Sequence, residues 1–411
     1  MNNHELLPHL FRTEYRKIAS VLSRRFGFEH LEIAEDITSD TFLTATQSWG
    51  LEGIPENPTA WLYQVAKNKA MNFLQRQKIF NEKITIEIGD TLYTQTEPEV
   101  DLSPKNINDS QLQMIFAICH PSISKEAQIG LSLRILCGFG IAEIANAFLT
   151  NKETINKRLF RAREILRREK IETTISSDQL TERLPAVLRT IYLLFNEGYY
   201  SIIQDTTLRK DFCLEALRLC TMLVENTSTN TSDVNALLAL MCFHLSRFDA
   251  RVSGTGDIIL YDEQDSSLWN TDLISKGGYF LKQAAVGDRL TTYHLEAALA
   301  YWNTQKPDTK EKWDNILYLY DELLQLEYSP IAALNRIYAL SKAIGKRQAL
   351  VEAKKLTMIG NQFYFALLGE LYTDIDNVKA LLNFQEAIAL AQTTADKMVL
   401  QKKVAKINRN S

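Results

Sequence analysis

The clearest structural pattern in the sequence is Gly140-Ile-Ala-Glu-Ile-Ala-Asn-Ala-Phe148, then Leu149-Thr-Asn151, then Lys152-Glu-Thr-Ile-Asn-Lys-Arg-Leu-Phe-Arg-Ala-Arg163. Apolar residues recur at three- and four-residue spacing on both sides of the short break, which predicts two amphipathic helices. The apolar positions are Ile141, Ile144, Ala145 and Phe148 in the first helix, and Ile155, Leu159, Ala162 and Leu166 in the second. Thr150 and Glu153 stand three residues apart, so we expect them to form a capping box where the second helix begins.

The second of these helices is basic on its outward side. The outward positions are Lys152, Thr154, Asn156, Lys157, Arg158, Arg161 and Arg163. Arginine and asparagine side chains read guanine and adenine edges, and lysine and threonine suit phosphates. A short helix, a tight turn and a capped basic helix is how a helix-turn-helix presents its second helix to the major groove. The pattern therefore predicts DNA contact, and the alternative is a solvated basic helix.

The other windows of the 411-residue chain also have helical periodicity, with few Gly and Pro residues, so the predicted class is all-α. Helices are expected over 5–27, 30–49 and 58–79. An acidic linker is expected over 81–110, where Pro98 and Pro104 interrupt helical periodicity. Helices resume near 111, and a polar stretch over 172–177 marks the next boundary.

Composition places the chain among folded cytoplasmic proteins. Hydrophobic residues make up 45% of it, which excludes a disordered chain, and its formal net charge is −4. The five cysteines form no Cys-x-x-Cys pair, so we expect reduced, mostly buried thiols. We expect no signal peptide and no membrane span, because no apolar run is long enough.

The segment Leu131 to Arg168 resembles region four, the promoter-binding part of sigma factors of the extracytoplasmic-function group. Two N-terminal stretches resemble their region two. Ala34-Glu-Asp36-Ile-Thr-Ser-Asp40-Thr-Phe42-Leu43-Thr-Ala45, followed by Trp49, is similar to the helix that grips core RNA polymerase. Pro58-Thr-Ala-Trp61 through Arg76 is similar to the helix that melts and reads the minus-ten element, although Asn72 stands where an aspartate is common.

The residue types fit these roles. Asp36 and Asp40 are one turn apart and form an acidic pair suited to a basic partner surface. We expect Phe42, Leu43 and Trp49 to pack in the core. Residues 62–81 carry several cations and no acid, which suits single-stranded DNA. The predicted minus-ten contacts are Trp61, Lys67, Asn68, Lys69 and Arg76, with a core position as the alternative for Trp61.

About 240 residues follow the region-four-like segment. They resemble a subgroup of these factors that has a C-terminal tetratricopeptide-like domain, in phrases such as Ile191-Tyr-Leu-Leu-Phe-Asn-Glu-Gly-Tyr199 and Asp262-Glu-Gln-Asp265-Ser-Ser-Leu-Trp269. An internal repeat supports this independently. Leu334 and Tyr338 recur as Leu368 and Tyr372, a shift of 34 residues, which is the tetratricopeptide period. The second copy continues through Ala380, Phe384 and Ala387.

A polar cluster in this extension needs its own interpretation. Its members are Asp249, Arg251, Asp262, Asp265 and Trp269, with Glu263 between them. No metal-ligand spacing, Gly-rich phosphate loop or hydrolase motif accompanies them, so we expect no catalytic residues, no metal and no cofactor. We interpret the cluster as a structural turn or interdomain contact, with a protein-partner site as the alternative.

The resemblance implies four segments. They are region two over 1–80, which binds polymerase and the minus-ten element; the acidic linker over 81–110; region four over 111–172, which binds the minus-thirty-five element; and a tetratricopeptide-like regulatory domain over 178–411. The expected partners are core RNA polymerase, promoter DNA and a protein partner of the extension. The alternative functions are a stand-alone helix-turn-helix regulator with a helical signalling domain and an enzyme with an accessory DNA-binding domain. A stand-alone regulator does not need the region-two-like residues over 30–78, so their presence favours the sigma-factor interpretation.

Overall fold

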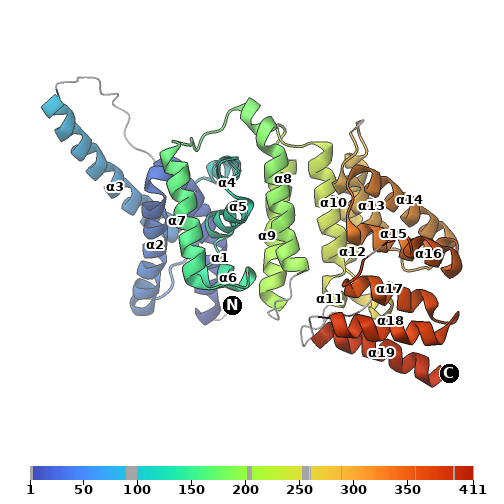
Figure 1. Cartoon of the computed structure of the whole chain (residues 1–411). Coiled ribbons are helices and arrows are strands. Elements are labelled where there is room, and N and C mark those ends of the chain that lie inside the picture. The colour runs from blue at the N-terminus through green and yellow to red at the C-terminus, as the bar shows by residue number, and fades with distance from the viewer. Residues whose placement is uncertain are drawn as a thin grey trace. The chain divides into compact units, whose positions relative to one another are not determined.

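The computed structural model describes residues 3–88, 100–200, 206–251, 259, 261–287, 289–356, 358–391 and 394–410. Within these residues all regular secondary structure is helical, which confirms the predicted all-α class. The helices form two compact units (Figure 1). Unit 1 comprises Met1–Ile203 and Thr207–Asn230, and unit 2 comprises Gln204–Thr206 and Thr231–Ser411.

Unit 1 contains both expected N-terminal modules and the first two helices of the extension. Its elements are α1 (Asn3–Phe26), η1 (Phe28–His30), α2 (Leu31–Glu52), α3 (Pro58–Ile88), α4 (Pro104–Ile118), α5 (Lys125–Leu131), η2 (Ser132–Leu136), α6 (Ile141–Ala147), α7 (Lys152–Arg168), α8 (Ser177–Tyr199) and α9 (Thr206–Glu225). Helix α1 packs against α2 and α4, and α8 packs against α4 and α5. The extension therefore begins inside the unit that carries the DNA-binding candidate.

The ends of the expected acidic linker are helical. No proline or glycine occurs between Gln75 and Ile88, so nothing in the backbone stops α3 at residue 79, and it continues to Ile88. At the other end Ser103 caps α4, and Pro104 occupies its first turn, where a missing amide costs nothing. Proline there starts a helix and does not interrupt one, so the linker prediction was wrong at both ends. Residues 89–99 of the predicted linker lie outside the described residues.

The three N-terminal helices enclose one apolar core. The rings of Phe11 and Phe42 meet edge to face with 5.0 Å between their centroids, and Tyr15 lies beside both. Phe42 and Trp49 are buried, as predicted. Leu43 is 54% exposed, so its predicted core position was wrong. It follows Phe42 directly and therefore points about 100° around the helix from the buried stripe.

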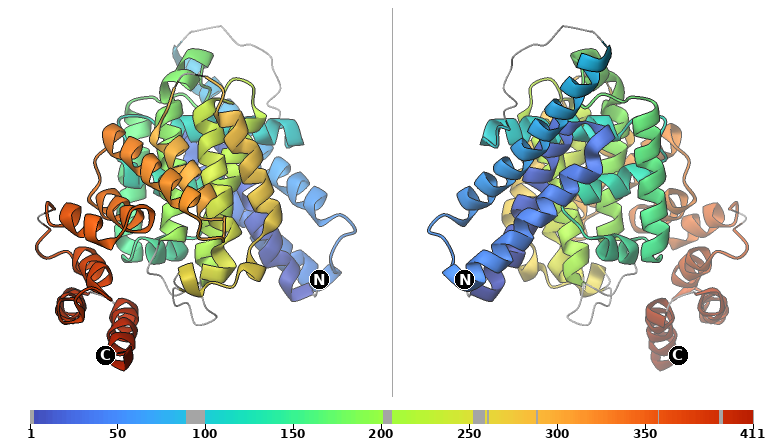
Figure 2. Two further views of the ribbon diagram at one scale, coloured as in Figure 1. Left: turned by 90° about the vertical axis from the view of Figure 1, so that its right-hand side faces the viewer. Right: turned by 90° about the vertical axis from the view of Figure 1, so that its left-hand side faces the viewer.

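Unit 2 is a succession of helices, each packed on its neighbours along the chain. Its elements are α10 (Ser232–Ser246), α11 (Phe248–Arg251), η3 (Tyr261–Glu263), η4 (Ser266–Leu268), α12 (Thr271–Ala284), α13 (Thr292–Trp302), α14 (Lys310–Leu326), α15 (Pro330–Ala343), α16 (Lys346–Ala353), α17 (Gln362–Tyr372), α18 (Asn377–Leu390) and α19 (Thr394–Asn410). Helix α10 packs between α12 and α13, and from α14 onward each helix packs on the next, as Figure 2 shows in orange and red.

The residues of the 34-residue repeat occupy corresponding places in this succession. Leu334 of α15 and Leu368 of α17 are both buried in one apolar cluster, with Tyr338 and Tyr372 against it. A Cβ at Gly369 would meet the ring of Phe384 at 2.8 Å, so any larger residue in this place of α17 would force that ring of α18 to shift. The repeat therefore marks helix-packing positions.

Candidate functional site

Helix α7 presents the basic face predicted from the sequence. Its inner residues Ile155, Leu159, Ala162 and Leu166 are all buried, as expected. The cap differs from the prediction, because the side chain of Asn151 and not that of Thr150 accepts the Thr154 amide, at 2.8 Å. Asn151 directly precedes the first helical residue, where a side-chain oxygen reaches the free amides best.

Most of the predicted DNA contacts on α7 face solvent. Lys152, Thr154, Asn156, Lys157 and Arg161 are exposed. Arg158 is half-buried, with its guanidinium 5.2 Å from the centre of the ring of Phe148, the residue directly after α6. A groove of about 400 Å³ runs between α5 and α7, and Lys157, Arg158 and Arg161 line it. The arrangement offers several cations to a phosphate backbone and fixes the planar group of Arg158 on an aromatic ring.

Arg163 is the exception on this helix. Its side chain is 13% exposed and donates to the carboxylate of Glu35 at 2.6 Å, with Glu32 at 3.9 Å. Arg134 of η2 lies 3.5 Å from the same Glu35 carboxylate. Glu35 is part of α2, so α7 is joined to α2 at this point. No local sequence pattern indicates the Arg163–Glu35 pair, because the two residues are 128 positions apart.

Helix α2 presents both predicted polymerase contacts on its surface. Asp36 and Asp40 are exposed and one turn apart. The Asp40 carboxylate forms an ion pair with Lys69 of α3, and Lys69 also donates to Thr44 Oγ1 at 2.8 Å. One predicted polymerase contact is therefore bonded to one predicted minus-ten contact, whereas Asp36 is not drawn into that pair.

The other minus-ten candidates lie along α3. Asn68 and Arg76 are exposed, and Lys67 is partly exposed. Trp61 is partly buried against Trp49, with 5.3 Å between the ring centroids. One edge of Trp61 thus belongs to the core of the three-helix module while part of it remains accessible.

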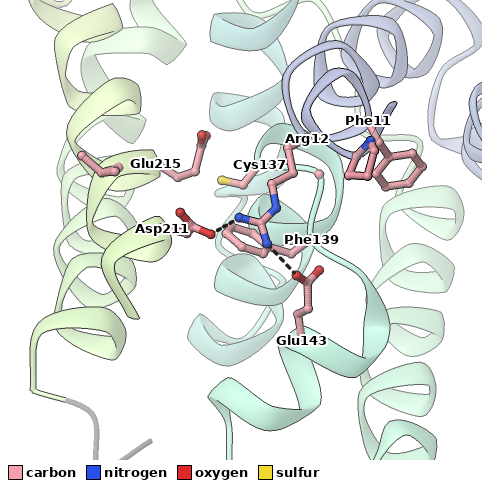
Figure 3. Close-up of a pocket in the computed structure, with 10 residues that line it drawn as sticks. Phe11, Arg12, Cys137, Phe139, Glu143, Asp211 and Glu215 are labelled. Atoms are coloured by element: carbon pink, nitrogen blue, oxygen red, sulfur yellow. Dashed lines mark hydrogen bonds and ion pairs between the residues drawn. The ribbon is translucent and has the colours of Figure 1, made fainter. Parts of the chain in front are cut away.

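A cavity of about 280 Å³ lies where α1, the segment before α6, and α9 meet within unit 1 (Figure 3). The guanidinium of Arg12 on α1 stands between Asp211 of α9 and Glu143 of α6. Burial raises the pKa of Asp211 above its usual range, although Arg12 lies against it. The cavity wall includes the Cys137 thiol, whose pKa burial raises, so this thiol is not a nucleophile at neutral pH.

The polar cluster predicted in the extension surrounds an aromatic pair in unit 2. Trp269 is buried beside Tyr261, and Asp265 caps η4 by accepting the Ser267 amide at 2.9 Å. Asp249 and Arg251 lie together on α11, and Asp262 is exposed on η3. The sequence analysis missed the cations over the two rings, which are Arg247, Lys306 and Lys312. No local sequence pattern relates Arg247 to Lys306 and Lys312, which follow much later in the chain.

The described residues contain no group of His, Cys, Asp or Glu side chains with the geometry to hold a metal ion. In the same part of the chain, no helix combines the length and the apolar character that crossing a bilayer requires. The thiols of Cys119 and Cys242 are buried, which raises the pKa of each to about 12. All five cysteines are buried, as predicted, and no disulfide joins any of them.

Comparison with known proteins agrees with this geometry in the N-terminal module. Residues 10–79 match the family model described as sigma-70 region 2. The chain is 27% identical to the RNA polymerase sigma factor YlaC of Bacillus subtilis, over 40% of this chain and 91% of that protein. It is 26% identical to the ECF RNA polymerase sigma-E factor of Haemophilus influenzae, over 36% of this chain and 79% of that protein.

These matches support a sigma factor of the extracytoplasmic-function type. Its extension has its own relatives. Residues 183–285 match a family of unknown function, DUF6596. An uncharacterized protein of Rhizobium meliloti is 30% identical over 90% of this chain and 88% of its own length, so the sigma modules and the extension occur together there too. No solved structure matches the chain.

Proposed function

We propose that this sigma factor binds core RNA polymerase and directs promoter recognition, with α2 on the polymerase, α3 on the minus-ten element and α7 on the minus-thirty-five element. The observation that supports it most is the combination of an acidic exposed pair, Asp36 and Asp40, with two separate basic helices in one unit. A polymerase contact and two DNA contacts are the minimum that this role requires.

The polymerase contact is tested by reversing the charge of Asp36 and Asp40 together. D36K/D40K should abolish co-elution with purified core polymerase, because two lysines would then face the basic surface that the acidic pair is proposed to bind. E29K/E56K is the matched control, since Glu29 and Glu56 are exposed acids outside α2 and the change in net charge is the same. The far-ultraviolet helical signal of both variants should equal the wild type. Unchanged co-elution of D36K/D40K would exclude α2 as the main contact.

The DNA contacts divide by chemistry. On α7, Asn156 and Arg161 have the groups that read base edges, and Lys152, Thr154 and Lys157 suit phosphates. On α3, Lys67, Lys69 and Arg76 suit the backbone of a melted strand, with Trp61 as a stacking surface and Asn68 as a hydrogen-bonding group. The alternative, a stand-alone helix-turn-helix regulator, requires α7 and not α2 or α3. Tight promoter binding in the absence of polymerase would favour it.

For the extension we propose a tetratricopeptide-like domain that regulates the sigma modules in cis or docks a protein partner. Successive helix pairs and the 34-residue repeat of packing positions support this class, and such stacks expose concave faces to proteins. Covalent attachment holds the extension at an effective concentration in the millimolar range. The cluster of Asp249, Arg251, Asp262, Asp265 and Trp269 is the candidate contact region. We infer no catalytic role.

Truncation tests the regulatory role, and the structure decides where to cut. A cut after Ser177 would remove α8, whose Val187, Ile191 and Leu194 are fully buried in unit 1, and would leave an open apolar face. A cut after Asn230 keeps unit 1 whole. Transcription in vitro with core polymerase should differ between residues 1–230 and the full chain. Equal activity, with and without candidate partners, would contradict regulation by unit 2.

A further inference from the structure

Helix α9 is bonded to the region-two module through α1. Arg16 of α1 forms an ion pair with Glu215 of α9, and the two side chains are only 14% and 15% exposed. One turn earlier, Arg12 pairs with Asp211 of α9 and lies 3.6 Å from Glu143 of α6 (Figure 3). Two consecutive turns of α1 are therefore fixed to two consecutive turns of α9.

The same face of α9 is bonded to the region-four module. Arg218 donates from Nε to the Glu215 carboxylate at 2.8 Å, and its guanidinium also donates to Gln111 Oε1 of α4 at 2.9 Å. It donates further to the carbonyl oxygen of Leu136 at 2.7 Å, just before the helix-turn-helix. Helix α9 thus joins the two modules that the sequence predicts as separate segments.

A second set of ion pairs lies on the other side of α1. Tyr15 is fully buried, and the guanidinium of Arg134 lies 5.3 Å from the centre of its ring. Arg134 and Arg163 both bind Glu35 of α2. Helix α1 is therefore held between the Arg12–Arg16 contacts with α9 and the Glu35 contacts with η2 and α7. We therefore expect loss of the α1–α9 ion pairs to weaken the packing of α1 near the Glu35 contacts as well.

The Glu35 contacts exclude a predicted DNA contact. A guanidinium that is 13% exposed and bonded to Glu35 has no face left for a base or a phosphate. Glu35 is also the direct neighbour of Asp36, so Arg163 of α7 contacts α2 next to the predicted polymerase contact. In this arrangement Arg163 is unavailable to DNA, and Glu35 of α2 is unavailable to any other partner.

We propose that α9 is an internal clamp that holds the region-two and region-four modules closed against each other, and that it must release before polymerase and promoter are bound. The proposal rests on the proposed function and adds the residues that regulate it. Arg12 and Asp211 are the positioning pair most open to testing, because their side chains are partly exposed, whereas Arg16 and Glu215 are nearly buried. The raised pKa of Asp211 agrees, since it shows that Arg12 does not fully offset the burial of this carboxylate.

The test measures the distance between the modules in the full-length protein. Spin labels on Q47C in α2 and R168C at the end of α7 sit on exposed positions, and the five native cysteines are buried. The variants are R12E, D211R and the charge swap R12E/D211R. R25E is the matched control, because Arg25 is an exposed arginine of the same helix. Affinity for purified core polymerase is measured on the same proteins without labels, and far-ultraviolet circular dichroism checks folding.

The wild type should give one short, narrow distance. R12E and D211R should each broaden it to longer values and bind core polymerase about three- to tenfold more tightly, because the closed population falls. The swap should restore both readings, and R25E should match the wild type. Unchanged distances and affinity in both R12E and D211R would overturn the clamp, as would a swap that stays open. If the modules separate in R12E while no protein binds core polymerase, the clamp stands and the proposed function fails.

Discussion

Substitution of Gly198 by alanine should disturb the packing of α8 against α9 and lower the stability of unit 1. A Cβ at this residue would lie 2.4 Å from the carbonyl oxygen of Arg209 and 2.7 Å from Cys213 Sγ. The first of these is backbone and cannot rotate away, so the two helices must separate by about 1 Å.

The separation breaks specific bonds. The buried guanidinium of Arg209 donates to the carbonyl oxygens of Gly198 at 3.1 Å and Tyr199 at 3.2 Å. Overpacking costs about 1–3 kcal/mol, and each weakened charge-assisted hydrogen bond costs up to about 1.5–3 kcal/mol. Against these, alanine gains about 1 kcal/mol in helix propensity over glycine. We therefore expect G198A to lower the free energy of unfolding of unit 1 by about 2–4 kcal/mol.

Urea unfolding followed by far-ultraviolet circular dichroism measures this change. G50A is the matched control in the same unit, because Gly50 is helical and nothing lies within 4 Å of a Cβ there. It should gain about 0.5–1 kcal/mol from propensity alone. A G198A midpoint equal to or above that of the wild type would refute the packing argument.

Four further outcomes are expected. N151A should cost about 1 kcal/mol of unit 1 stability in urea melts, because it removes the cap of α7, while T150A should cost less. R161A should flatten the salt dependence of promoter binding by about one if Arg161 contacts a phosphate, and R158A should in addition loosen α6 by removing the stacking on Phe148. G369A should destabilise unit 2 by about 1–3 kcal/mol, and F384L should rescue part of it. Burial, with Arg251 and Arg247, lowers the pKa of His244 to about 3, so the neutral imidazole stabilises unit 2 fully above about pH 6.5 and this stabilisation is lost as pH falls. The free energy of unfolding of unit 2 should therefore fall by about 1–2 kcal/mol between pH 7 and 5. The H244Q variant should lose less over the same range, although His294, whose pKa is also lowered, adds to the pH dependence.

Periodicity was sufficient for the class of fold and for the inner face of α7. Ile155, Leu159, Ala162 and Leu166 are buried because three- and four-residue spacing places them on one stripe, whatever they pack against. The same rule located Phe42 and Trp49. It failed at Leu43, because apolar character alone does not say which side of a helix a residue occupies.

Single-sequence reasoning could not reach the contacts between modules. Arg163 was grouped with the outward cations of α7 by its charge, but its position is turned toward α2, where Glu35 meets it. Pairing two charges 128 residues apart requires the tertiary fold, and neither residue differs locally from a solvated one. Arg12 and Asp211 are a second case, since they are 199 positions apart and bridge α1 and the extension. The candidate site was therefore predictable as a list of groups and not as a set of pairs.

The placement of α8 and α9 changes how the extension should be understood. Thr190 of α8 accepts a hydrogen bond from the thiol of Cys119 at 3.3 Å and donates to Gln128 of α5, so polar groups as well as apolar ones join α8 to α4 and α5. A regulatory domain joined only by a flexible linker would act only through its local concentration. Here the first helices of the extension share a core with the sigma modules, and any event in unit 2 that displaces α9 would act on Arg12 and Arg16 directly. The ion pairs of Arg12 and Arg16 account for only part of the free energy of such a displacement, because Phe212, Ala216 and Leu219 of α9 are fully buried as well.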